Sequence, residues 1–323
     1  MHHPAAVLDT STPAAGDFRD LEDAGRAYVE ASTSASTRRG YTGDWARFEA
    51  WCQGRGVQSM PAADAVCAAY VVQLAEDGRK PATIDRALAA IRKAHRLAGL
   101  EAPTGEATRM VRRGVRRSKG TAQTQAAPVL APDLRAMVAG LEDSPAGLRD
   151  RALLLLGFAG AFRRAELAGL RVEDVREAGD RGVVVTLRAS KTDQEGQGRE
   201  VAIPFGRSEL ACPVRALAAW REAGNIDAGP LFRPVDRHGN IGLEAITGRS
   251  VARVVKRAAE LAGLDPAAYS GHSLRAGLAT SAALAGASER AIMRQTGHNS
   301  TTMVRRYIRS ADLWRDNAAS AVL

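Results

Sequence analysis

Residues 182–204 read GVVVTLRASKTDQEGQGREVAIP, and this stretch decides the fold class because the hydrophobic pattern changes here. The runs 182–187 and 199–204 are rich in β-branched residues, and a polar, glycine-containing segment separates them. This pattern predicts two strands of a small sheet joined by a mobile loop. In most of the remaining chain, apolar residues recur at the helical spacings of three and four. We therefore expect a mainly α fold with a small β-sheet.

Helices are expected on both sides of this hairpin. Ala131-Pro132-Asp133 marks a helix start, and apolar residues follow at helical spacing through residue 141. Residues 151–170 predict a buried helix followed by a turn, and helices return from Cys212 onward. Together with the hairpin, these segments predict an α+β domain over residues 129–323.

A separate, all-helical domain is expected over residues 18–117. Tyr41, Trp45 and Phe48 lie three or four residues apart and form one apolar stripe. Further helices are expected over residues 62–75 and from Pro81 onward, since proline suits the first turn of a helix. Residues 1–17 are rich in Ala, Pro, Ser and Thr without a periodic apolar pattern, so we expect a disordered tail there.

The two domains are separated by a basic segment. Residues 109–119 contain no acidic residue, and residues 120–128 are too polar and small to build a core. We interpret residues 118–128 as an exposed linker that follows the basic end of a helix. A solvated helix face is the alternative interpretation of the basic run. Contact with a nucleic-acid duplex explains it better, because no carboxylates balance the charge.

The overall composition is that of a helical globular protein with a basic surface. The chain has 323 residues, of which 45% are hydrophobic, and its formal net charge is +9. Such a charge favours an acidic partner such as nucleic acid, although a generally arginine-rich proteome explains it equally simply.

The cysteines and the apolar runs bear on where the protein works. Its three cysteines are far apart and fit neither a disulfide framework nor paired zinc ligands, so we expect buried thiols in a reducing compartment. The longest apolar run, residues 152–162, is too short to span a bilayer, and the first residues do not resemble a secretory signal. We expect a cytoplasmic protein with no membrane partner.

The last third of the chain carries an unusual series of polar groups. His272-Ser273-Leu274-Arg275 is followed by Gly297-His298 and then by Tyr307, nine residues after that histidine. Guanidinium and imidazole groups can neutralise a phosphate, and a phenol can attack it as a nucleophile. A metal site is the rival interpretation, but this spacing fits no metal-ligand pattern, so we expect no metal.

A family resemblance covers these positions and two more. Gly160-Ala161-Phe162-Arg163-Arg164-Ala165-Glu166-Leu167, then Lys191 in the hairpin loop, then the three motifs above resemble the tyrosine recombinase, or phage integrase, family. The resemblance extends more weakly to the N-terminal helical domain, whose layout is similar to the core-binding domain of the Cre-like subgroup. It implies an enzyme that cuts and rejoins DNA through a 3′-phosphotyrosyl intermediate and a Holliday junction, without an energy cofactor or any other cofactor.

The resemblance also implies a role for each matched residue. Arg163 and Arg275 would neutralise the two non-bridging oxygens of the phosphate, since the arginine fork is planar, always charged and bidentate. Tyr307 would be the nucleophile, its anion stabilised by the arginines, and Lys191 would protonate the leaving 5′-oxygen. Glu166 would orient Arg163 or a neighbouring group. The two histidines complete the set, His272 in proton transfer or positioning and His298 as a hydrogen-bond donor to the phosphate.

Arg164 competes with Arg163 for the same role. If both lie in a helix, they point about 100° apart, and only one can face the site. The motif favours Arg163, which leaves Arg164 for a salt bridge or a contact with the DNA backbone.

Duplex DNA contacts are expected mainly from the N-terminal domain. Cations near two helix starts suit phosphate binding, and the resemblance suggests that the helix containing Thr83 reads base edges, with Arg86 and Asp85 facing DNA. The full set of candidate DNA-binding residues is Arg38, Arg39, Lys80, Thr83, Arg86, Arg112, Arg113, Arg116 and Arg117.

The C-terminal tail carries an apolar stripe with little of its own domain left to cover. By resemblance, residues 311–323 would form a protomer-exchange helix donated to a neighbour, linking a homo-tetramer around two duplex DNA sites in the nucleoid. Docking on its own domain is the alternative. Two other functions remain possible from the sequence: a type IB-like DNA topoisomerase, which shares the catalytic set, and a catalytically inactive DNA-binding accessory protein.

Overall fold

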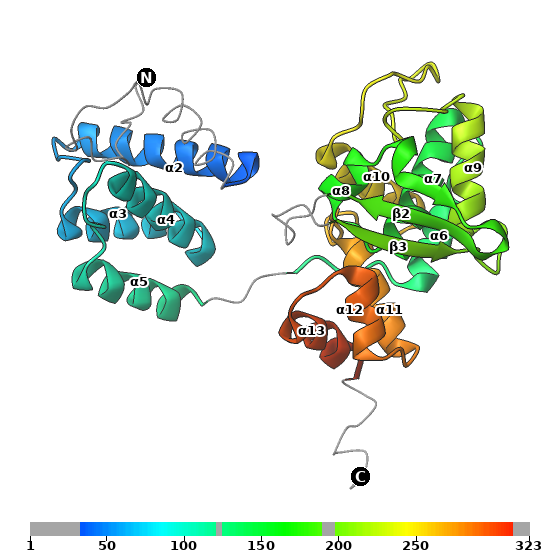
Figure 1. The fold of residues 1–323 in the computed structure, drawn as a ribbon. Helices are drawn as coiled ribbons and strands as arrows, with labels where there is room; N and C mark the ends of the chain where they lie inside the picture. The colour runs from blue at the N-terminus through cyan, green and yellow to red at the C-terminus, as the bar shows by residue number, and fades with distance from the viewer. Residues whose placement is uncertain (1–32, 121–124, 189–197, 313–323) are drawn as a thin grey trace, which may run out of the picture. The chain divides into compact units, whose positions relative to one another are not determined.

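The protein forms two compact units in a computed structural model that describes residues 33–120, 125–188 and 198–312. The first unit comprises residues 1–124 and the second residues 125–323. Within the described residues the first unit is helical, and the second combines helices with one three-stranded sheet (Figure 1). The expected fold class, mainly α with a small β-sheet, is confirmed.

Four described helices build the first unit: α2 (Ala35–Gly54), α3 (Asp64–Glu76), α4 (Pro81–Leu97) and α5 (Glu106–Lys119). The Ser34 side chain caps α2, and Pro81 occupies the first turn of α4, as its position in the sequence predicted. Phe48 from the predicted stripe is fully buried, and it packs with Tyr70 of α3 at a ring-centroid distance of 5.1 Å. The helical stripes of the sequence therefore form one core.

The basic run 109–119 is helical throughout. It forms nearly all of α5, which continues two residues beyond the boundary expected at residue 117. Val111 and Val115, one helical turn apart, pack against the core of the unit, as expected of an amphipathic helix. Arg113 and Arg117 are exposed, whereas Arg112 and Arg116 pair with Asp85 of α4. Beyond the linker, Ala127 N and Val129 N donate to backbone carbonyls of residues 268 and 273, which joins residues 127–129 to the second unit.

The sheet of the second unit contains the predicted hairpin. Strands β2 (Gly182–Leu187) and β3 (Arg199–Pro204) pair antiparallel with Leu187 opposite Arg199, and their bounds are those that the sequence predicted. A short strand that was not predicted, β1 (Val175–Glu177), pairs with the other edge of β2. At three residues, β1 is too short to give a recognisable alternating pattern.

Eight helices of the described part surround or extend this sheet. They are α6 (Ala131–Ala139), α7 (Pro145–Ala159), α8 (Arg164–Gly169), α9 (Pro213–Ala223), α10 (Gly248–Leu261), α11 (Ser273–Leu284), α12 (Glu289–Thr296) and α13 (Thr301–Asp312), with short 3₁₀ turns at Val172–Asp174 and Gly179–Arg181. The main core lies around α7, where Leu153, Leu154 and Leu156 are fully buried. Trp220 of α9 packs there and donates its indole N–H to the Leu231 carbonyl at 2.8 Å.

The segment 151–170, expected as a buried helix followed by a turn, contains parts of two helices with a turn between them. Helix α7 ends at Ala159, Gly160 caps it, and α8 begins only at Arg164. Ala161 has φ of +49°, a left-handed conformation that no residue adopts inside an α-helix. The apolar pattern continues through this turn because Ala161 and Phe162 are themselves buried, so periodicity alone could not reveal the break.

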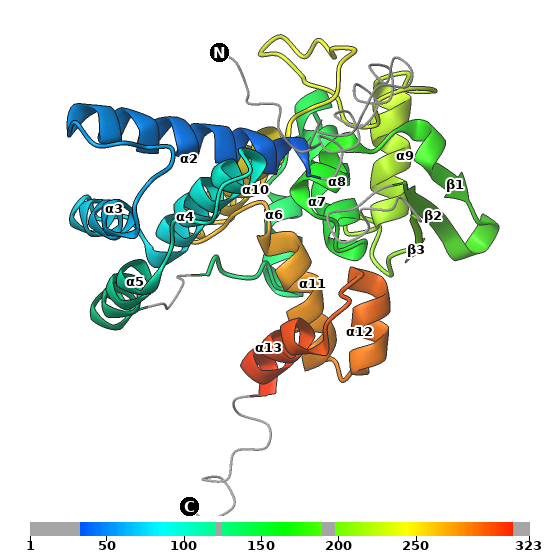
Figure 2. The same ribbon diagram turned by 60° about the vertical axis from the view of Figure 1, so that its left-hand side comes forward.

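Helices α11, α12 and α13 form a small cluster of their own, lying side by side in Figure 2. Ala279 and Ala283 of α11 pack with Ile292 of α12 and Val304 of α13. The small alanine side chains let the helix backbones approach closely. Tyr307 packs at the edge of this cluster, so the packing of α13 determines where its phenol lies.

The first unit depends on one carboxylate that joins two helices. Asp64 at the start of α3 accepts from the backbone N–H groups of Gly105, Ala107 and Thr108 at the start of α5, at 2.8, 2.9 and 3.1 Å. These N–H groups have no partner within their own helix, and a carboxylate is the strongest acceptor for them.

We expect Asp64→Ala to lower the free energy of unfolding by about 2 kcal/mol, because it removes a charged cap and leaves several donors unpaired. Urea unfolding of the full chain, followed by circular dichroism, would measure the loss. Glu76→Ala, at an exposed position of the same helix, is the matched control and should change stability little. Equal stability of the two variants would contradict this role of Asp64.

Candidate active site

The end of helix α12 organises the polar groups of the second unit. The last carbonyls of a helix lack partners within it. Here the Gln295 carbonyl accepts from Arg199 Nη1 at 3.1 Å, and the Thr296 carbonyl accepts from Arg275 Nη1. Gly297 follows in the left-handed conformation, with φ of +65°, and closes the turn by donating to the Met293 carbonyl. Two guanidinium groups are therefore fixed by consecutive carbonyls.

Arg275 is one of the largest fully buried side chains of the molecule. Its Nη1 also donates to the Ala161 carbonyl at 2.8 Å, and the left-handed Ala161 is what turns this carbonyl towards it. Its Nη2 is buried and has no hydrogen-bond partner among the described residues. Burial, with the charge of Arg163, lowers the pKa of Arg275 to about 10, so the group stays charged at neutral pH.

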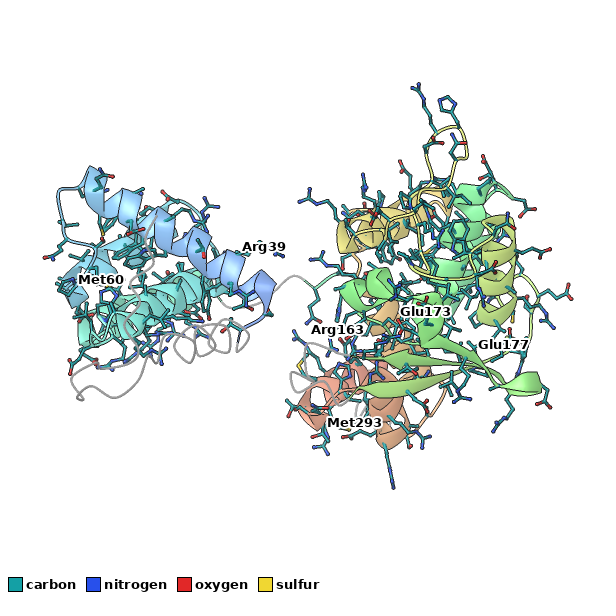
Figure 3. The ribbon with its side chains drawn as sticks, turned by 45° about the horizontal axis from the view of Figure 1, so that its top comes forward. Arg39, Met60, Arg163, Glu173, Glu177 and Met293 are labelled. Carbon is teal, nitrogen blue, oxygen red and sulfur yellow. The ribbon has the colours of Figure 1, made fainter. Side chains whose placement is uncertain are left out.

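Arg163 lies directly before α8 rather than within it, in extended backbone conformation. The expectation that Arg163 and Arg164 are adjacent residues of one helix was therefore wrong, because only Arg164 is in α8. Glu166 accepts from the Arg163 backbone N–H at 2.9 Å and from its Nη1 at 2.6 Å, and its own side chain is almost fully buried. Arg163 is thus oriented by Glu166, whereas Arg164 is exposed and lies beside Gly271. Figure 3 marks the position of Arg163 in the second unit.

The phenol of Tyr307 contacts both histidines of the motif. The hydroxyl lies 3.1 Å from His272 Nε2, and the ring centroid lies 5.9 Å from that of His298. Burial raises the pKa of Tyr307 above its ordinary value, although the charges of Arg275 and Arg306 act in the opposite direction. The charges of the arginines therefore favour the phenolate, as expected, but do not outweigh burial, so a proton acceptor helps to form it. His272 lies within reach of the hydroxyl.

Both histidines are held neutral. Burial and the charges of Arg275 and Arg163 lower the pKa of His272, and the same causes lower the pKa of His298 to about 4. The Nδ1 atom of His298 lies 2.7 Å from the hydroxyl of Thr296, which is fully buried. Thr296 therefore fixes the imidazole ring and leaves its Nε2 edge for another contact.

Arg199 joins this group although the sequence analysis did not select it. It is the first residue of β3 and shares the inner face of the strand with Val201 and Ile203, which are buried. A charged residue in phase with two core residues is the signal that could have revealed it. With Arg163 and Arg275 it makes three guanidinium groups near one carboxylate, Glu166. The site has an excess of positive charge.

The remaining predicted residues are in two places. Lys191 lies outside the described residues. The candidate DNA-binding residues belong to the first unit, where Arg86 pairs with the buried Asp44 at 2.7 Å, and Arg112 and Arg116 both pair with Asp85. Asp85 therefore contacts α5. Of the others, Arg39, Lys80, Arg113 and Arg117 are exposed, and Arg38 and Thr83 are half-buried.

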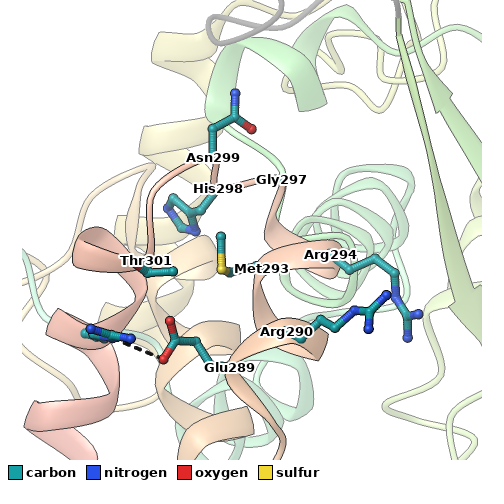
Figure 4. A pocket seen from close by; sticks show the side chains of 9 residues that line it. Glu289, Arg290, Met293, Arg294, Gly297, His298, Asn299 and Thr301 are labelled. Atoms are coloured by element: carbon teal, nitrogen blue, oxygen red, sulfur yellow. Dashed lines mark hydrogen bonds and ion pairs between the residues drawn. The ribbon is translucent and has the colours of Figure 1, made fainter.

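A shallow hollow of about 680 Å³ opens beside the site, between α12 and α13. His298 lines it, as do Arg290, Arg294 and Arg305, while the carboxylate of Glu289 pairs with Arg305 at 3.2 Å (Figure 4). Positive charge thus extends from the buried site to the surface. The described residues contain no cluster of three or more side chains able to hold a metal ion. Among the described helices, none is both long and apolar enough to cross a membrane.

The comparisons with known proteins agree with this geometry. The sequence pattern of the Phage integrase family matches residues 129–313, and that of the phage integrase N-terminal SAM-like domain matches residues 28–101. This chain belongs to the phage integrase family of tyrosine recombinases. Members of this family break and rejoin DNA strands, so the resemblance inferred from the motifs is confirmed.

Similar proteins match over most of their length. An integrase/recombinase xerD homolog of Selenomonas ruminantium is 40% identical over 90% of this chain and 86% of its own, and recombinase cre of Escherichia phage P1 is 27% identical over 81% and 80%. Among solved structures, the Tn1549 transposon integrase in complex with transposon right-end DNA superposes with a TM-score of 0.61 at 15% identity, over 93% of this chain and 96% of the other. That last likeness concerns the fold alone.

The depressed pKa of His298 has a consequence for stability. Between pH 6.5 and about 4 the unfolded chain binds a proton at this histidine and the native recombinase does not, so stability falls as the pH falls through this range. We expect His298→Gln to make the free energy of unfolding less dependent on pH there, as measured by urea unfolding at several pH values. His238→Gln, at an exposed position outside the site, is the control. An unchanged slope in the His298 variant would refute the neutral imidazole.

Proposed function

We propose that this recombinase acts at a specific duplex DNA site and cuts one strand by attack of the Tyr307 oxygen on the phosphorus atom. The bond to the 5′-oxygen breaks, leaving a 3′-phosphotyrosyl link and a free 5′-hydroxyl. The observation that carries this proposal is the contact of the Tyr307 hydroxyl with His272 Nε2 at 3.1 Å beside the buried Arg275. No energy cofactor is needed, because the covalent link conserves the energy of the phosphodiester.

The first step requires that the phenol lose its proton. Since burial raises the pKa of Tyr307, the phenolate does not form readily without an acceptor. A lowered pKa keeps His272 neutral at pH 7, and its Nε2 lies within hydrogen-bonding distance of the hydroxyl. We assign His272 as the group that takes this proton. Lys191 is the sequence-based candidate for the acid that protonates the leaving 5′-oxygen.

The phosphate is held by the positive groups. The buried Nη2 of Arg275 and the Glu166-oriented guanidinium of Arg163 suit the two non-bridging oxygens. Together, the three arginines and the one carboxylate described here carry a net positive charge. The negative charge of a phosphodiester would balance part of it. The charge that develops on the phosphoryl oxygens is then met by donors already in place, which is the most effective form of electrostatic catalysis. The Thr296 hydroxyl donates to the Ile292 carbonyl at 2.7 Å, so its contact with His298 places the proton of the neutral ring on Nδ1. The Nε2 atom would donate to a phosphate oxygen once the ring binds a second proton, which a bound phosphate favours.

Strand exchange sets the expected assembly. Recombination between two duplex sites breaks four strands, and each chain carries one Tyr307. We therefore propose a homo-tetramer on two DNA sites, proceeding through a Holliday junction, in the cytoplasm and bound to the nucleoid. Of the tail that would link the protomers, residues 311–323, the first two residues end α13 and the others lie outside the described residues. Basic residues of the first unit and the arginines of the α12–α13 hollow would contact the phosphate backbone.

The test is covalent capture. A duplex site is first selected from a random-sequence library with the Tyr307→Phe variant and then prepared with a nick that traps the cut product. We expect wild type to form a denaturation-resistant protein–DNA adduct and Tyr307→Phe to form none, because phenylalanine has no attacking oxygen. Tyr269→Phe, at a buried tyrosine of the same unit, is the matched control and should form the adduct.

Other outcomes would identify the alternatives. If wild type forms no adduct, the chain is an inactive DNA-binding protein. Adduct formation without sequence preference, combined with relaxation of any supercoiled plasmid, would instead indicate a topoisomerase. Adduct formation by Tyr307→Phe would exclude this tyrosine as the nucleophile.

A further inference from the structure

Arg199 occupies a position among buried apolar residues, where removing its charge from water costs free energy. It begins β3 opposite Leu187 of β2, and both Leu187 and the next inward residue, Val201, are buried. Burial lowers the pKa of the Arg199 guanidinium, which reflects the cost of removing the charge from water. A hydrocarbon side chain would fit the same face of the strand at lower cost.

The contacts of Arg199 are with the turn that carries His298. Its Nη1 donates to the Gln295 carbonyl at 3.1 Å. Its Nε and Cζ atoms lie so close to Gly297 that a Cβ on that glycine would be only 2.8 Å from them. Real Cβ atoms essentially never approach so closely, so a side chain at position 297 would displace the Arg199 guanidinium, and the positive φ would strain it as well. The Arg199 side chain therefore packs directly against the backbone of the residue before His298.

A simple ion pair does not explain this residue. Glu166 is the carboxylate that acts on Arg199, but both of its oxygens already accept from Arg163. The rest of the guanidinium is already engaged: Nη1 donates to the Gln295 carbonyl, and Nε and Cζ pack against Gly297, while the buried Nη2 has no hydrogen-bond partner among the described residues. The contacts that the structure shows for Arg199 are therefore those with the turn between α12 and α13.

Gln295 strengthens the same attachment from the other side. Its Nε2 donates to the Ala159 carbonyl at the end of α7, at 2.7 Å, and to the Ala202 carbonyl of β3, at 3.2 Å. With Arg199, these bonds tie α12 to the sheet and to α7 at the residue that stands two positions before Gly297. A shift of the turn would have to break these bonds or move β3 with it.

We propose that Arg199 is a positioning residue of the strand-cleavage site, which holds the Gly297-His298 turn against β3 and so sets where the His298 imidazole meets the phosphate. This role rests on the proposed function. The positive charge of Arg199 also contributes to keeping His298 neutral. Arg199 thus acts on the reaction through His298.

The test compares Arg199→Met with wild type in single-turnover cleavage of the nicked duplex site. Methionine retains apolar bulk but neither the charge nor the donors. We expect cleavage to slow by about tenfold to a hundredfold, since a misplaced catalytic group costs that much, while duplex binding stays near the wild-type level. Removal of a neighbouring positive charge should raise the pKa of His298, so its imidazole NMR signals should titrate at higher pH.

Two further variants keep the test decisive. Arg199→Lys retains the charge and should restore the wild-type titration of His298, which covers the case in which the methionine variant does not fold. Arg176→Met, at an exposed arginine of β1, is the matched control and should change neither the rate nor the titration. In addition, Gly297→Ala should lower the melting temperature less in an Arg199→Ala background than in wild type, because the clashing guanidinium is then gone.

The outcomes separate this proposal from the proposed function. If Arg199→Met cleaves at the wild-type rate and leaves the His298 titration unchanged, the positioning role is overturned while the recombinase function stands. If wild type itself forms no adduct, the proposed function fails and the catalytic part of this role fails with it. A titration that shifts together with a slower rate supports both.

Discussion

The unsatisfied carbonyl groups at the end of α12 are the constraint on which the site depends. A helix end bears partial negative charge and acceptors without partners, and here two arginines from distant segments meet that need. One arginine comes from a strand and the other from α11, so this single turn joins the sheet to the helical cluster. The left-handed Gly297 then reverses the chain and lets α13 return Tyr307 to the same place.

Burial disfavours the charged form of every titratable group in the site, but the groups differ in the charge that they carry at neutral pH. It disfavours the charged forms of the histidines and of the phenol alike, so the imidazoles stay neutral and the tyrosine stays protonated. Arginine remains cationic because its pKa begins so high that even a large shift leaves it charged at neutral pH. The same environment thus supplies permanent cations and neutral proton acceptors side by side. Chemistry on a phosphodiester without a metal requires both.

The sequence predicted the parts of the molecule that local chemistry determines. Strands β2 and β3 and the helix starts at Pro81 and Ala131 follow from alternation and proline position, and the motif residues around Arg163, His272 and Tyr307 do meet in the structure. The break at Ala161 was hidden because the turn is as apolar as the helix before it. Arg199 was missed because its meaning depends on Gln295 and Gly297, about a hundred residues away, and only the fold brings them together. Lys191 and the C-terminal tail stay predictions.

The excess of positive charge has a consequence for the free protein. Among the described residues, three guanidinium groups lie near one carboxylate in a largely buried place, and such an arrangement costs stability wherever it is not compensated. A bound polyanion lowers that cost, and by thermodynamic linkage whatever binds only the folded form also stabilises it. The positive charges that lower the stability of the free protein are therefore the same charges that favour DNA binding. The second unit would therefore be most stable when it is bound to a duplex. Its greatest rigidity would then coincide with the state in which it acts on DNA.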